Sequence, residues 1–93
     1  MVKGGEATFY DLSPGSPMSW KRLPFDRTKM TAAMPKNIAG PHGIVPFGSV
    51  ATVTNLHTGR SIKVVLTDHG PYVVGRDIDL TPAAWQALTG IAP

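Results

Sequence analysis

The chain has 93 residues, of which 42% are hydrophobic, so it can form one domain with a single small core and does not resemble a disordered chain. Its ten glycines and nine prolines indicate short strands joined by tight turns and argue against a helical bundle. A net charge of +3 weakly favours acidic partners, and the absence of cysteine excludes disulfides.

The first part of the chain predicts one strand followed by a loop. The stretch "EATFYDL", residues 6–12, is typical of a short strand, and "SPGSPMS", residues 13–19, contains turn formers that no regular element tolerates. Residues 34–48, "MPKNIAGPHGIVPFG", hold three prolines and three glycines, so we expect mostly loop there.

A hairpin is predicted next. Residues 49–54 and 61–67 alternate in the manner of strands, and in the second of them Ile62, Val64 and Leu66 share one face. The intervening "NLHTGR", residues 55–60, has the Asn and Gly of a hairpin turn.

Residues 81–90, "TPAAWQALTG", predict a short helix. Thr81 is a suitable N-cap, Pro82 fits the first helical position and Gly90 can end the helix. Leu88 falls on the same face as Leu80 and Ala84 and is expected in the core. Together these elements predict a small all-β barrel with a short helix, because barrel closure removes sheet edges that so short a chain could hardly cover.

Three of the six acidic residues lie between positions 68 and 79. Asp68 stands at the end of a predicted strand, where a rigid scaffold can aim a side chain at a ligand. Asp77 and Asp79 would share one face of a strand, with Arg76 able to offset their repulsion. Turn formation by Asp68, helix support by Asp79 and a solvated Asp77 are the structural alternatives.

The sequence predicts neither a metal site nor a bound cofactor. His42, His57 and His69 lack the close spacing of metal ligands, and His57 falls in the predicted hairpin turn. No phosphate-binding loop or basic-aromatic stripe is present, so we expect no nucleic acid partner. No apolar run approaches the roughly 18 residues of a membrane helix, and "MVKGGEATFY" has no signal-peptide apolar region, so we expect no membrane contact.

Several segments, taken in order, resemble one family. "GEATFY", "MTAA" and "VPFGSVATVTNLHTGRSIKVVLTDHGPYVVGRDIDLTPAAW" (residues 45–85) are similar to the double-psi β-barrel of rare lipoprotein A (RlpA). The resemblance implies a mainly β, six-stranded double-psi β-barrel with one or two short helices. It would be a single domain over residues 1–93, with its core at about 5–90, related to the barrels of expansins and family 45 endoglucanases.

The resemblance also implies catalytic residues for peptidoglycan cleavage, where the family uses a Glu, a His and an Asp. The Asp falls on Asp68, and His42 matches the His if "MPKNIAGP" is an insertion, because it lies four residues before Pro46. The Glu position holds Leu23, which cannot transfer a proton, and His69 replaces the Arg that usually follows the Asp.

Further residues are candidates for substrate contact. Sugar rings stack on aromatic faces, and the candidates for this role are Tyr72, Tyr10 and Trp20. Trp85, in contrast, is expected to pack in the core. His69 could hold the substrate beside Asp68. The resemblance to related barrels adds Asp79 and Asp11. Together with Glu6 and Asp26, these two are possible stand-ins for a second carboxylate.

Three functions follow as hypotheses. The first is lytic transglycosylase-type cleavage of peptidoglycan glycan strands, with Asp68 as acid and base. The second is a non-catalytic, expansin-like module that binds wall glycan. The third is a structural component of a larger protein assembly, such as a phage tail. The expected location is accordingly the periplasm or cell wall for an exported protein, or the virion.

Overall fold

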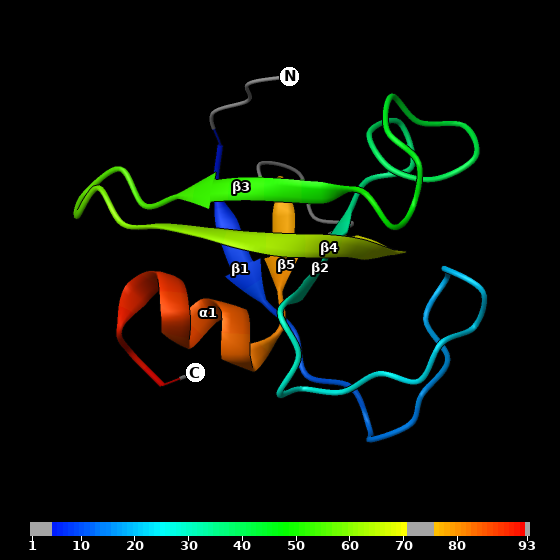
Figure 1. Ribbon diagram of the computed structural model, residues 1–93, viewed down its shortest axis with the longest axis horizontal. Helices are drawn as coiled ribbons and strands as arrows, with labels where there is room; N and C mark the ends of the chain where they lie inside the picture. Colours follow the sequence, from blue (N-terminus) through cyan, green and yellow to red (C-terminus); the bar gives the residue numbers. More distant parts are fainter. Residues whose placement is uncertain (1–4, 71–75, 93) are drawn as a thin grey trace.

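The computed structural model of the chain describes residues 5–70 and 76–92. In chain order the elements are β1 (Ala7–Phe9), β2 (Thr31–Met34), β3 (Val50–Thr54), β4 (Ser61–His69), β5 (Ile78–Leu80) and α1 (Pro82–Thr89). The strands form one sheet in the order β1-β5-β2-β4-β3, and α1 packs beside it (Figure 1). The predicted class, mainly β with a short helix, is confirmed.

The described residues hold five strands, one fewer than the six implied by the resemblance. Two further pairs, Pro17 with Pro24 and Ala39 with Val45, make only isolated bridges. The pair of prolines cannot extend into a ladder because proline has no N–H to donate. The first strand is also shorter than the predicted 6–12, and β2 was not predicted from the pattern, since "TAAM" is short and rich in alanine.

Parallel and antiparallel pairing are mixed within the sheet. β1 pairs with β5 and β2 with β4 in parallel, whereas β2–β5 and β3–β4 are antiparallel. Parallel neighbours need long connections, and here each connection carries other strands, so the early and late parts of the chain interleave. In Figure 1, β3 and β4 accordingly run across the view while β1, β5 and β2 cross behind them.

The β3–β4 hairpin is confirmed. Asn55 N donates to Arg60 O at 2.8 Å, and Gly59 takes a φ of 78° that favours glycine. β4 continues two residues beyond the predicted end, to His69, and is the strand that joins β3 to the rest of the sheet.

The predicted helix and its core face are confirmed. The Thr81 hydroxyl oxygen accepts from Ala84 N at 3.3 Å, and Gly90 ends the helix with a φ of 75°. Leu80, Ala84 and Leu88 are buried, in one cluster with buried side chains of β2 and β4. Trp85 packs partly buried against this cluster, with its ring centroid 5.3 Å from that of Phe9. No helix among the described residues has the length and apolar character that crossing a membrane requires.

Two long segments, residues 10–30 and 35–49, lie on either side of the end of β4 (Figure 1). The first contains a small hairpin, residues 16–25, that docks on β4 through Trp20 N, which donates to Thr67 O at 2.9 Å. The Trp20 ring packs on Gly48 of the other segment, where a Cβ would lie 2.8 Å from it. The two segments therefore fix each other as well as the strand end.

The turn of the 16–25 hairpin stores backbone strain. Lys21 and Arg22 have φ values of 52° and 54°, as the two central residues of a type I′ turn do, and Leu23 N donates to Trp20 O at 3.0 Å. Residues with a Cβ are disfavoured in this region, and glycine is not.

We expect Arg22→Gly to raise the free energy of unfolding by about 0.5–1 kcal/mol, because it removes the Cβ clash at positive φ while costing some unfolded-state entropy. Urea unfolding followed by tryptophan fluorescence measures the difference. Arg22→Ala is the matched control, since it removes the same side chain but keeps the Cβ. A gain of the same size in Arg22→Ala would contradict the assignment to backbone strain.

Candidate functional site around Asp68 and Asp79

A row of residues crosses four strands on one face of the sheet. Ala33 of β2 pairs with Asp68 of β4 on one side and with Asp79 of β5 on the other, and Asp79 pairs with Thr8 of β1. Directly paired residues point to the same face, so both aspartates project beside the small Ala33 side chain. Two strand spacings separate them, which places their Cα atoms about 10 Å apart.

A β-bulge puts Asp68 into this row. The β2–β4 register shifts between Ala32, which pairs with Leu66, and Ala33, which pairs with Asp68, so Thr67 is left without a partner in β2. Leu66 therefore faces the core while Asp68, two residues later, faces the other side. Bulges of this kind re-aim a side chain, and they are common beside active sites.

Ser19 holds the Asp68 carboxylate. The Ser19 hydroxyl donates to Oδ1 at 2.6 Å and Ser19 N at 3.1 Å, while His69 N donates to the same oxygen at 2.9 Å. Oδ2 makes no hydrogen bond to a described residue, so it is the oxygen that a ligand could meet. The sequence did not predict Ser19, since it lies 49 residues from Asp68 in a loop without a motif.

Asp79 is held from the first strand. Thr8 Oγ1 donates to Asp79 Oδ1, and a Cβ on Gly70 would lie 3.3 Å from Oδ2, so the backbone that leaves β4 passes beside this carboxylate. Asp77 precedes β5 instead of lying in it, and its Oδ2 accepts from Glu6 N at 3.0 Å. The prediction that Asp77 and Asp79 share one face of a strand is therefore wrong, because the strand begins only at Ile78.

Tyr10 lies against the same aspartates. Its hydroxyl oxygen is buried without a partner of hydrogen-bond geometry among the described residues, and its ring centroid lies 5.3 Å from that of Phe25. Burial raises the pKa of Tyr10 well above its usual value, and the nearby charges of Asp68 and Asp79 raise it further. The neighbouring Thr67 hydroxyl offsets only part of this rise.

The two predicted site histidines form a second group. His42 and His69 line a pocket of about 290 Å³ together with Lys36 and Pro41. Consecutive residues of a strand point to opposite faces, so His69 leaves β4 on the face opposite to Asp68. No hydrogen bond joins His42 to Asp68 in the described part of the chain. His57 is exposed in the β3–β4 turn, as expected.

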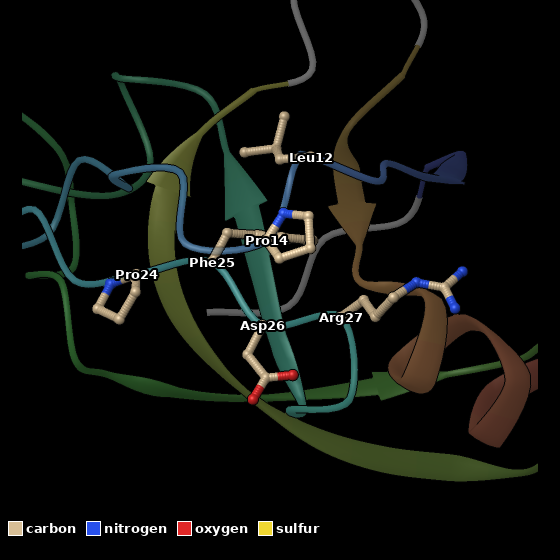
Figure 2. A pocket seen from close by; sticks show the side chains of 6 residues that line it. All are labelled: Leu12, Pro14, Pro24, Phe25, Asp26 and Arg27. Carbon is tan, nitrogen blue, oxygen red and sulfur yellow. The ribbon is translucent and has the colours of Figure 1, made fainter.

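The larger pocket, about 350 Å³, lies elsewhere, between the first loop and the 16–25 hairpin (Figure 2). Its two charged side chains, Asp26 and Arg27, point away from each other in Figure 2. Hydrogen bonds from Thr28 to Asp26, at 2.6 and 2.9 Å, lower the pKa of that carboxyl. Arg27 instead pairs with the predicted residue Asp11, at 3.0 Å. Both charged side chains of this pocket are therefore already engaged within the protein.

Two predicted features remain. Leu23, where the resemblance implies a Glu, lies in the 16–25 hairpin and is 38% exposed. Tyr72 lies outside the described residues. Within residues 5–70 and 76–92, no three His, Asp or Glu side chains gather closely enough to hold a metal ion.

We expect Tyr10→Phe to raise the free energy of unfolding at pH 7 by about 1 kcal/mol, because a buried hydroxyl without a partner is costly. In the wild type, the folded state keeps the Tyr10 proton at alkaline pH values at which the unfolded chain has already released it. The contribution of the raised Tyr10 pKa to the free energy of unfolding is therefore complete below about pH 10. It is lost as pH rises toward the raised pKa. Tyr10→Phe should remove this loss.

Chemical unfolding at pH 7 to 11 measures both effects. Phe25→Leu serves as the control, since it loses the ring contact but keeps the Tyr10 hydroxyl, and should be less stable with the alkaline decline intact. Parallel pH curves for the wild type and Tyr10→Phe would contradict the assignment.

Comparison with known proteins agrees with this architecture. The family model described as lytic transglycolase matches residues 3–91. The chain is 40% identical over 87 residues to endolytic peptidoglycan transglycosylase RlpA of Escherichia coli O157:H7, covering 94% of this chain and 22% of that protein. It is 37% identical over 89 residues to the probable endolytic peptidoglycan transglycosylase RlpA of Treponema pallidum (strain Nichols), covering 95% of this chain and 25% of that protein. The chain thus spans about a quarter or less of the length of these relatives, and it belongs to the lytic transglycolase family as an RlpA-like double-psi β-barrel.

Proposed function

We propose that this barrel acts on peptidoglycan glycan strands by lytic transglycosylase-type cleavage, with Asp68 as the acid and base. The observation that carries the proposal is a half-buried carboxylate at the end of β4, held at Oδ1 by three donors while Oδ2 is left for a ligand. The names of the relatives support the substrate, since they are described as endolytic peptidoglycan transglycosylases.

One carboxyl is sufficient for this chemistry. Protonated Asp68 gives its proton to the glycosidic oxygen as the bond from that oxygen to the sugar C1 breaks. The 6-hydroxyl of the same sugar then attacks C1, and the Asp68 carboxylate takes the hydroxyl proton, so the protonated acid is restored. The products are a free sugar hydroxyl and an anhydro-sugar end, with no water consumed. Leu23 at the family's Glu position is compatible with this scheme, because no second proton carrier is needed.

Hydrolysis is less well supported, although Asp79 supplies a second carboxylate. An inverting hydrolase needs its two carboxyl groups about 6.5–9.5 Å apart and a retaining one about 5–5.5 Å. The Cα separation of about 10 Å is compatible with the inverting range, since side chains on one face can approach each other. However, Asp79 Oδ1 is engaged by the Thr8 hydroxyl. We therefore assign Asp79 to substrate contact.

Leu23 itself supports a second candidate, a non-catalytic module that binds wall glycan. An exposed leucine where relatives place a proton carrier removes a catalytic group without filling the site. Either function would put the barrel in contact with the cell wall, in the periplasm or at the cell surface. Pull-down by intact sacculi without any release of glycan fragments would favour this second candidate.

Incubation with amidase-treated, peptide-free glycan strands tests the first candidate. We expect anhydro-sugar ends in the products, detected by mass spectrometry, and a fall of at least about tenfold in rate for Asp68→Asn, which cannot transfer the proton. Asp26→Asn is the matched control, because its carboxyl is engaged by Thr28 in the other pocket. Equal rates for Asp68→Asn and the wild type would remove Asp68 from the mechanism.

Ser19 should act as a positioning residue for Asp68. We expect Ser19→Ala to lower kcat by about tenfold with a smaller change in KM, because a misaligned carboxyl loses proton transfer more than binding. Ser19→Thr retains a hydroxyl that can donate to Oδ1 and should recover most of the rate. If the threonine variant is as slow as the alanine variant, the hydrogen bond from the Ser19 hydroxyl to Asp68 does not determine the rate.

A further inference from the structure

Trp20, in the 16–25 hairpin, holds a partly accessible aromatic ring in a fixed position. The ring is half-buried, and one edge of it packs on Gly48, where a Cβ would lie 2.8 Å from the ring. Gly48 is itself held by its N–H, which donates to Leu66 O at 2.9 Å. The chain therefore keeps a rigid, flat apolar surface at the protein surface, and such aromatic faces stack with sugar rings.

The Lys21 side chain lies over the Trp20 ring, with Nζ 5.6 Å from the ring centroid. A cation–π contact at an exposed site is weak, so a ligand that stacks on the ring displaces the ammonium at small cost. Lys21 makes no ion pair with a described residue, and its ammonium carries three donors that can turn toward the oxygens of a ligand. Ring and ammonium together offer stacking and hydrogen bonding, the two contacts that a neutral sugar uses.

The backbone of the turn is strained at the residue that supplies this ammonium. Lys21 and Arg22 have φ values of 52° and 54°, in the left-handed region that the turn type fills with glycine or asparagine. Both side chains are exposed, so burial of their side chains in the core does not compensate the strain. Backbone strain that packing does not explain is typical of ligand-binding positions. The strain therefore indicates a surface role for a side chain at this turn.

The hairpin places this ring next to the proposed site of cleavage. Trp20 N donates to Thr67 O at 2.9 Å, and the preceding Ser19 hydroxyl donates to Asp68 Oδ1 at 2.6 Å. The Trp20 backbone therefore lies about one strand spacing, about 4.8 Å, from β4, one residue before the acid. Neighbouring sugar units of a glycan strand are separated by a similar length. A unit stacked on Trp20 thus leaves the next unit within reach of Asp68.

We propose that Trp20 and Lys21 form a sugar-binding subsite, which takes a β-1,4-linked N-acetylhexosamine unit adjacent to the unit at Asp68. The choice of sugar rests on the proposed function. The indole ring covers the apolar C–H face of the sugar, and the Lys21 ammonium donates to one of its oxygens, the acetamide carbonyl included. The subsite lengthens the stretch of glycan that the barrel holds and does not take part in the proton transfer.

Titrations followed by NMR of the two tryptophan indole N–H signals test this subsite in the wild type. The probe is chitotetraose, a β-1,4-linked tetramer of N-acetylglucosamine, and the control is maltotetraose, which has neither that linkage nor acetamide groups. We expect chitotetraose to shift the Trp20 signal and not that of Trp85, which packs against Phe9 and the core cluster. A Trp20 signal that stays in place, or that both sugars shift equally, would overturn the subsite.

Lys21→Gly separates a binding role from a structural one. The glycine relieves the positive φ, so the variant should unfold at a higher urea concentration than the wild type, yet bind chitotetraose about fivefold more weakly. Arg22→Gly is the matched control, because it relieves the same strain but keeps Lys21, and it should bind as the wild type does. Trp20→Leu should weaken binding by about tenfold, whereas Trp85→Phe should not. Equal binding by the two glycine variants would remove Lys21 from the subsite and overturn the proposal.

The outcomes separate this inference from the proposed function. If the wild type cleaves glycan strands but chitotetraose leaves the Trp20 signal in place, the subsite is wrong and the function stands. If chitotetraose binds through Trp20 and Lys21 but no anhydro ends are released from glycan strands, the subsite stands and the cleavage is wrong.

Discussion

The bulge in β4 is the constraint on which the site depends. If β4 alternated regularly with no bulge at Thr67, Asp68 would continue the face of Ile62, Val64 and Leu66, which packs in the core. A carboxylate there would be desolvated without a partner, at a cost of several kcal/mol, and would not reach a ligand. The bulge moves Asp68 to the opposite face and also returns His69 to the side of Met34. A single register shift thus sets the direction of both polar side chains at the strand end.

Both long loops hold the side chains that the bulge positions, Asp68 and His69. The 16–25 hairpin holds Thr67 through Trp20 N and Asp68 through Ser19, so it engages both the extra residue and the residue that it re-aims. The segment 35–49 holds His69 through Ala39 O and through the ring of Phe47. Since Trp20 packs on Gly48, the two loops also contact each other. The end of β4 is therefore fixed from both faces by parts of the chain that are remote in sequence.

The departures from the family pattern also lie in these two loops. Leu23 stands in the hairpin where the resemblance implies an acid, and the segment before His42 holds an insertion if His42 matches the family's His. Asp68, on which the resemblance places the family's Asp, lies in the sheet. Such a distribution is expected when a rigid sheet carries the shared chemistry and loops carry what differs between members of a family.

The sequence by itself determined the local elements: the β3–β4 hairpin from alternation and its turn, and α1 from Thr81, Pro82 and Gly90, because these signals act over a few residues. It also made Asp68 a candidate, since a carboxylate at a strand end within a recognisable motif is a local feature. Only the tertiary structure decided that Asp68 and Asp79 flank Ala33, that Ser19 holds Asp68, and that His42 shares a pocket with His69 and not with Asp68. The physical reason is that parallel pairing of interleaved strands and a one-residue bulge join positions 34 to 71 residues apart, and no pattern within a short window of sequence specifies such a register.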